Sequence, residues 1–88
     1  MVYVYVLLSL KDRKFYTGYT DDLRRRFNEH RRGTVFATKS RRPFKLIYYE
    51  ACLSQKDAKE RELYLKTAWG KRYLKHRLKN YLNKNPMR

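Results

Sequence analysis

The sequence predicts an α+β fold in which a small three-stranded antiparallel sheet is flanked by helices. A β-branched and aromatic run opens the chain at residues 2–8, and similar runs follow at 15–20 and 44–51. Between and after these runs the apolar residues recur at helical spacing, bounded by capping residues. Three strands are enough for a sheet, and the helices supply the second layer that covers it.

The chain length predicts one domain, which we place at residues 1–84, followed by a frayed tail at 85–88. Hydrophobic residues make up 42% of the 88 residues, so the composition is that of a folded chain. Lysine and arginine number 23 against 8 acidic residues, a formal net charge of +15. So large a positive charge on a small domain favours a polyanionic partner.

Composition also excludes several classes of protein. No apolar run approaches the roughly eighteen residues that a membrane span needs, and residues 1–8 lack the flanks of a signal peptide, so we expect a cytoplasmic protein. The single cysteine, Cys52, excludes an internal disulfide and a multi-thiolate zinc site. We expect Cys52 to be a small packing residue.

The first strand, at residues 2–8, is apolar on both faces, which predicts a central strand covered on both sides. A polar turn at 11–14 leads into the second strand at 15–20, and we expect that strand to break at Gly18. The hairpin brings Tyr5 and Tyr16 into one neighbourhood, with their register left open.

A helix is predicted at residues 21–32, with Thr20 as its N-terminal cap and Gly33 at its end. Residues 33–43 then have little apolar content and several cations, which predicts an exposed basic loop.

The inner face of this helix carries charge. At 100° per residue Phe27 and His30 fall on the inner side, and Arg26 lies about 40° from His30. Arg24 and Arg25 point to solvent, as consecutive arginines usually do.

The third strand is predicted at 44–51. The Ser-x-x-Asp sequence that starts at Ser54 resembles a capping box, and the helix that it opens runs to about Thr67. We expect Trp69-Gly70 to break the pattern and a last, strongly basic helix to occupy 71–84.

The helix after Ser54 has an inner face that can be computed. Ala58, Arg61, Glu62 and Leu65 fall within about 100°, whereas Glu60 lies on the far side. Glu62 is therefore predicted to point inward. An ion pair with Arg61 is the structural alternative to a functional role for this carboxylate.

Five ionisable side chains from four predicted elements thus face inward: Tyr5, Tyr16, Arg26, His30 and Glu62. Taken singly, each is more often a packing or pairing residue. Their convergence is what favours chemistry.

These residues carry a family resemblance. Tyr3-Val4-Tyr5, ten intervening residues, Tyr16-Thr17-Gly18, and then Arg26, His30 and Glu62 resemble the GIY-YIG nuclease superfamily. The resemblance covers about residues 2–66 and is strongest to small stand-alone members that resemble the N-terminal nuclease module of the UvrC repair protein. Tyr3, Val4 and Thr17 depart from the residue types that name the two motifs.

The resemblance implies a metal-dependent endonuclease that hydrolyses phosphodiester bonds, in structured or damaged DNA, with a role in DNA repair. We expect Tyr5 to be the general base, Tyr16 to position a phosphate, and Arg26 to stabilise the charge of the transition state. His30 is a proton shuttle or a phosphate ligand. Glu62 would hold one hard divalent cation, Mg²⁺ or Mn²⁺, with water and phosphate completing its shell.

Excess cations predict a nucleic-acid-binding surface, with DNA favoured over RNA and no membrane partner. Its predicted members are Arg24, Arg25, Lys39, Arg41, Arg42, Lys71, Arg72, Lys75 and Lys79. Two other functions fit the same charge. One is a catalytically inactive nucleic-acid-binding module of the same fold, and the other is a membrane-surface protein acting through the basic last helix.

Overall fold

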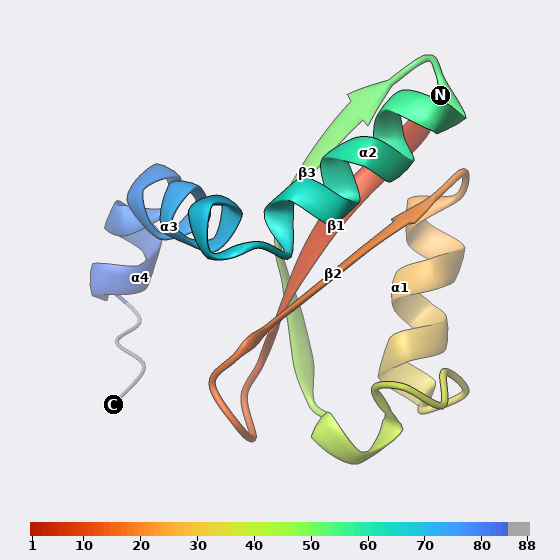
Figure 1. Cartoon of the computed structure of the whole chain (residues 1–88). Helices are drawn as coiled ribbons and strands as arrows, with labels where there is room; N and C mark the ends of the chain where they lie inside the picture. Colours follow the sequence, from red (N-terminus) through yellow and green to blue (C-terminus); the bar gives the residue numbers. More distant parts are fainter. Residues whose placement is uncertain (85–88) are drawn as a thin grey trace.

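A computed structural model describes residues 1–84, so the tail predicted at 85–88 lies outside the described residues. In chain order the elements are β1 (Val2–Ser9), β2 (Phe15–Thr20), α1 (Leu23–Arg32), the 3₁₀ helix η1 (Lys39–Arg41), β3 (Phe44–Cys52), α2 (Gln55–Leu65), α3 (Ala68–Arg77) and α4 (Lys79–Lys84) (Figure 1).

The three strands form one antiparallel sheet in the order β2-β1-β3. The predicted α+β fold and the central position of β1 are therefore confirmed. Tyr5 lies opposite Gly18 of β2 and opposite Tyr49 of β3. Tyr16 pairs with Leu7, one step along the same face, which makes Tyr5 and Tyr16 diagonal neighbours.

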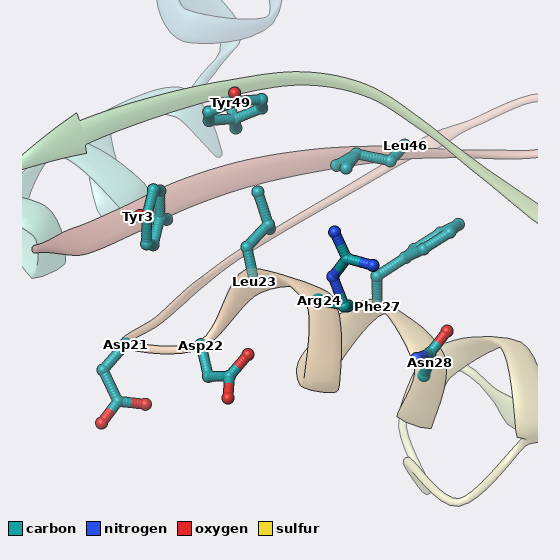
Figure 2. A pocket seen from close by; sticks show the side chains of 9 residues that line it. All are labelled: Tyr3, Asp21, Asp22, Leu23, Arg24, Phe27, Asn28, Leu46 and Tyr49. Atoms are coloured by element: carbon teal, nitrogen blue, oxygen red, sulfur yellow. The ribbon is translucent and has the colours of Figure 1, made fainter.

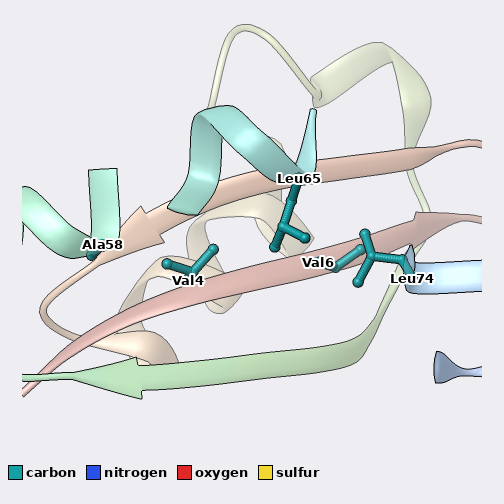
Figure 3. Close-up of a cluster of buried hydrophobic side chains, with 5 residues drawn as sticks. All are labelled: Val4, Val6, Ala58, Leu65 and Leu74. Carbon is teal, nitrogen blue, oxygen red and sulfur yellow. The ribbon is translucent and has the colours of Figure 1, made fainter. Parts of the chain in front are cut away.

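Each face of β1 carries its own core. Val4 and Val6 pack with Ala58, Leu65 and Leu74, which come from α2 and α3 (Figure 3). On the other face, Tyr5 and Leu7 form a cluster against which α1 packs. The two helices α1 and α2 thus cover opposite faces of the sheet (Figure 1).

The start of α1 differs from the prediction by two residues. Asp22, not Thr20, is the N-cap, because its carboxylate accepts the backbone N–H of Arg25 at 3.0 Å. Thr20 is the last residue of β2, and its hydroxyl accepts the N–H of Asp22. The predicted break at Gly18 is wrong, since β2 continues through it. Gly33 ends α1 in the left-handed conformation, with a φ of 78°.

The last helix was predicted with the wrong boundary. Trp69 and Gly70 do not break the pattern but lie inside α3, whose N-cap is Thr67. A β-carbon at Gly70 would collide with the backbone of Tyr64 and Leu65, so this glycine permits α3 to pack against the end of α2. The interruption comes instead at Leu78, between α3 and α4.

Residues 33–43 are only partly the exposed loop that was predicted. Val35 and Thr38 are buried, and η1 forms within the segment. The Ser9 hydroxyl donates to the carbonyl of Arg41, which ties the segment to the end of β1. The segment therefore packs between the end of β1 and α1, where Thr38 contacts His30.

Candidate active site

The side chain of Tyr5 occupies the space that Gly18 of β2 leaves open. Tyr5 is 1% exposed, and a β-carbon at Gly18 would lie 2.5 Å from the Tyr5 hydroxyl oxygen. Only glycine leaves room for the hydroxyl at this position. Tyr5 of the first motif pairs with Gly18 across the two strands. This pairing explains why the Tyr16-Thr17-Gly18 motif has a glycine.

His30 is the only residue of α1 that is fully buried, and both of its ring nitrogens are hydrogen-bonded. Nε2 lies 2.8 Å from the Tyr5 hydroxyl, and Nδ1 lies 2.8 Å from the Thr38 hydroxyl. The predicted inward orientation of His30 is what the structure shows. Because no surface of the imidazole reaches solvent, this conformation favours a proton shuttle over a direct phosphate ligand.

Burial controls the protonation of this pair. It lowers the pKa of His30 to about 4, and the positive charge of Arg26 acts in the same direction. Burial also raises the pKa of Tyr5 to about 12, although its interaction with Arg26 opposes that rise. At neutral pH the site therefore holds a neutral imidazole next to a protonated phenol.

Arg26 is shared between the site and its own helix. Its Nη1 donates to a carboxylate oxygen of Glu29 at 2.9 Å, and its guanidinium also interacts with the Tyr5 hydroxyl. These contacts raise the pKa of Arg26, Glu29 contributing most, and keep it charged. A guanidinium has five N–H donors, so Arg26 retains donors for a phosphate.

Tyr16 is half-buried. The centre of its ring lies 6.5 Å from that of Tyr5 and 5.2 Å from that of His30. The ammonium of Lys66 lies 6.0 Å from the centre of the same ring. Tyr16 thus lies near both the buried tyrosine–histidine pair and Lys66 at the end of α2.

Glu62 points inward as predicted, with its side chain 13% exposed, whereas Glu60 is exposed. Its ionic partner is Lys66, at 3.0 Å, one helical turn further on. The alternative of an ion pair between Glu62 and Arg61 is wrong, because Arg61 binds Glu50 of β3 through two nitrogens. The carboxylate of Glu62 still acts electrostatically on Tyr5 and raises its pKa slightly, as the last of several influences.

The donor set fits one hard cation and not a multi-ligand metal centre. Residues 1–84 contain no group of three or more histidine, cysteine, aspartate or glutamate side chains arranged to hold a metal. A single carboxylate is sufficient for Mg²⁺, which keeps several waters and takes its other ligands from substrate phosphates. Glu62 is the residue that would hold such a cation, and its carboxylate is paired with Lys66 in this structure.

The cations predicted to bind nucleic acid lie at several different places on the surface. Arg41, Lys71 and Lys75 line a groove of about 470 Å³ with the turn at residues 12–15. Lys39 and Arg42 line a second basic pocket of similar size. Within the first groove Arg41 forms an ion pair with Asp12, which holds the pKa of that carboxyl well below its usual range.

The remaining cations are more dispersed. Arg25 pairs with Asp21 at 3.4 Å, and Arg72 lies over the ring of Trp69 at 4.8 Å. Lys79 is exposed on α4. Arg24 lines a pocket of about 510 Å³ between α1 and the sheet (Figure 2). None of the five predicted catalytic and metal residues lines that pocket, so we do not assign the active site to it.

Sequence reasoning missed three side chains at this site: Glu29, Lys66 and Thr38. Glu29 and Lys66 carried a signal, because they follow Arg26 and Glu62 by three and four residues, the spacing of helical ion pairs. Thr38 carried no such signal. It belongs to a segment without periodicity, and only the folded chain brings it to His30.

Comparisons with known proteins show the family of this chain. Residues 1–76 match the GIY-YIG catalytic domain. The chain belongs to the GIY-YIG family. Among the relatives of this GIY-YIG protein, a UPF0213 protein of Clostridium perfringens is 40% identical over 67 residues, covering 75% of this chain and 71% of the relative. A UPF0213 protein of Streptococcus agalactiae is 43% identical over 65 residues, 73% of each chain.

A solved structure extends the agreement to three dimensions. The solution NMR structure of a UPF0213 protein from Bacillus halodurans superimposes with a TM-score of 0.52 at 37% identity, covering 84% of this chain and 82% of that one. Within residues 1–84, the GIY-YIG protein has no helix long and apolar enough to cross a membrane.

Proposed function

We propose that this protein is a metal-dependent endonuclease that hydrolyses phosphodiester bonds in DNA, with structured or damaged DNA as the substrate class. The observation that carries the proposal is the convergence of Tyr5, Tyr16, Arg26 and His30 around one hydroxyl, with Glu62 close enough to act on it electrostatically. Membership of the GIY-YIG family supports it. The proposed role is in DNA repair, and the proposed location is the cytoplasm.

In this proposal Tyr5 removes a proton from the attacking water while its own hydroxyl proton passes to Nε2 of His30. The water O–H bond breaks as its oxygen bonds to phosphorus, a new O–H bond forms on Tyr5, and the old one is replaced by an N–H bond on the imidazole. The P–O bond to the leaving oxygen breaks, and that oxygen takes a proton from solvent. The contact of 2.8 Å between Tyr5 and His30 supports this direction, because a neutral imidazole accepts one proton.

Arg26 and Tyr16 act on the phosphate. Donors of Arg26 that Glu29 does not use stabilise the charge that develops on the phosphate oxygens. The half-buried Tyr16 offers a hydroxyl that positions the phosphate next to Tyr5. A Mg²⁺ or Mn²⁺ ion held by Glu62 would neutralise phosphate charge and lower the pKa of a bound water.

A basic nucleic-acid-binding module without turnover is the second candidate, and a specific observation favours it. Glu62 is occupied by Lys66, and the Tyr5 residue is almost wholly buried, which are features of a closed site. The same basic groove would serve either function.

Incubation with DNA separates the two candidates. Purified protein is mixed with branched, nicked and linear DNA, and with a matched RNA, in Mg²⁺, in Mn²⁺ or in EDTA. The endonuclease predicts cleavage of at least one DNA substrate that EDTA abolishes. Binding to DNA without cleavage in either metal would contradict it and leave the binding module.

A further inference from the structure

A chain of buried hydrogen bonds passes through His30. The Tyr5 hydroxyl lies 2.8 Å from Nε2, and the Thr38 hydroxyl lies 2.8 Å from Nδ1. Thr38 also directs its hydroxyl at the carbonyl of Val35, at 3.5 Å. The residues Tyr5, His30 and Thr38 are each 1% exposed or less, so solvent does not compete for these bonds.

The direction of each bond follows from the Tyr5 end. Among the described residues the Tyr5 hydroxyl makes one hydrogen bond, to Nε2 of His30, and the guanidinium of Arg26, which also acts on this hydroxyl, has only donors. The hydroxyl proton of Tyr5 therefore goes to the acceptor next to it in the described structure, Nε2 of His30. In a neutral imidazole one nitrogen accepts and the other donates, which places the ring proton on Nδ1.

The contacts of Thr38 are consistent with this direction. If the Thr38 hydroxyl donates to the carbonyl of Val35, its oxygen is free to accept a proton from Nδ1. The backbone N–H of Thr38 bonds the same carbonyl at 3.1 Å, which fixes the residue in a tight turn. The backbone turn thus holds Thr38 beside His30.

We propose that Thr38 is a positioning residue that holds His30 in the Nδ1–H tautomer, so that Nε2 always faces Tyr5 as a proton acceptor. The catalytic consequence rests on the proposed function, whereas the tautomer does not. With the proton on Nε2 instead, His30 would donate to Tyr5 and the transfer from Tyr5 to the imidazole would be blocked.

The tautomer is measured directly by long-range ¹H–¹⁵N NMR of the histidine rings at neutral pH. The signals of His30 are assigned with His76→Gln, which removes the exposed second histidine. We expect the Nδ1–H pattern in the wild-type protein and in Thr38→Ser, which keeps the hydroxyl. Thr38→Val keeps the shape but removes the oxygen, and should shift His30 to the Nε2–H form or to a mixture.

Two outcomes would overturn the assignment. One is an Nε2–H pattern for His30 in the wild-type protein, a result that needs no variant to fold. The other is a Thr38→Val spectrum whose His30 tautomer equals that of the wild type.

Cleavage assays test the catalytic consequence separately. Thr38→Val should lower kcat by about 10–100-fold with KM unchanged, as when other groups that orient a histidine through its second nitrogen are removed, and Thr38→Ser should restore it. Equal kcat in Thr38→Val and wild type would refute the catalytic role. A protein that cleaves nothing but shows the expected tautomers would refute the nuclease while the positioning role stands.

Discussion

The two faces of the sheet carry polar clusters made from the same residue types. On the α2 face, Glu50 accepts two hydrogen bonds of 2.9 Å from Arg61 and one of 2.8 Å from the Tyr48 hydroxyl. On the α1 face, the Tyr5 hydroxyl is bonded to a neutral imidazole instead of a carboxylate. Arg26 meets its glutamate there through a single nitrogen.

The difference lies in which groups remain available. Glu50 is saturated by Arg61, and burial, together with hydrogen bonds to Tyr73 and Glu50, raises the pKa of Tyr48 and keeps it protonated. Such a cluster links β3 to α2 and stabilises the fold. Around Tyr5, by contrast, a base faces the phenol and a guanidinium has donors to spare. Residue type alone therefore does not identify a site; the partners of each residue do.

Removing one oxygen from each face gives the largest expected contrast. Tyr5→Phe should lower the cleavage rate by at least about 100-fold, because it removes the group that exchanges the proton. Tyr48→Phe removes the same atom from the other cluster and should leave cleavage unchanged while costing about 1 kcal/mol of unfolding free energy. Rates on DNA with Mg²⁺ and chemical denaturation measure the two effects. Similar cleavage by both variants would refute the distinction between the faces.

The second contrast concerns pH. The pKa of His30 is about 4 in the folded protein and about 6.5 in an unfolded chain, so the unfolded state binds the proton first as pH falls. The contribution of neutral His30 is present above pH 6.5 and is lost between about 6.5 and 4, by roughly 3 kcal/mol. His30→Gln should remove this part of the pH dependence, and His76→Gln on the exposed face of α3 should not. Chemical denaturation at pH 7 and at pH 5 measures the unfolding free energy of both proteins. The same change between the two pH values in the wild type and in His30→Gln would contradict the burial argument.

Sequence reasoning reached the fold because each strand and most caps are local signals. The apolar faces of β1, Gly33 and Ser54 were all readable from neighbouring residues. It failed where a contact far along the chain decided the outcome. Gly70 sits inside a helix because α3 packs against the backbone at Tyr64, and no local pattern contains that information.

The candidate site shows the same division. Helical geometry placed Arg26, His30 and Glu62 on inner faces, but it could not name their partners. Arg61 pairs with Glu50 because β3 lies beside α2, and Arg41 pairs with Asp12, which is 29 residues away in the sequence. The roles of the five site residues stay predictions.

A smaller effect is expected at the basic groove. Lys71 and Lys75 line it, so Lys71→Ala with Lys75→Ala should weaken DNA binding and reduce the slope of log K against log salt by about 2. The matched control is Lys56→Ala with Lys59→Ala, which removes the same charge from exposed positions of α2. Binding isotherms from 50 to 200 mM salt measure both, and equal slopes would place the DNA elsewhere on the surface.

The smallest effect concerns Cys52, which packs at the edge of the core on the α2 face and donates to the carbonyl of Ser54 at 3.5 Å. Cys52→Ala should cost about 1 kcal/mol of unfolding free energy as a small cavity and leave cleavage intact. Loss of cleavage in a variant that keeps its melting temperature would show that the α2 face takes part in the chemistry through this thiol.

The most direct test of the proposed site compares Glu62→Gln with Glu60→Gln on the same helix, assaying DNA cleavage as Mg²⁺ is titrated. Glu62→Gln keeps the shape of the side chain but removes the charge that would hold the cation, and its exposed partner Lys66 contributes little stability. We expect Glu62→Gln to abolish cleavage with DNA affinity unchanged or higher, and Glu60→Gln to cleave as the wild type does. Equal cleavage by the two variants at saturating Mg²⁺ would remove Glu62 from the site and contradict the account.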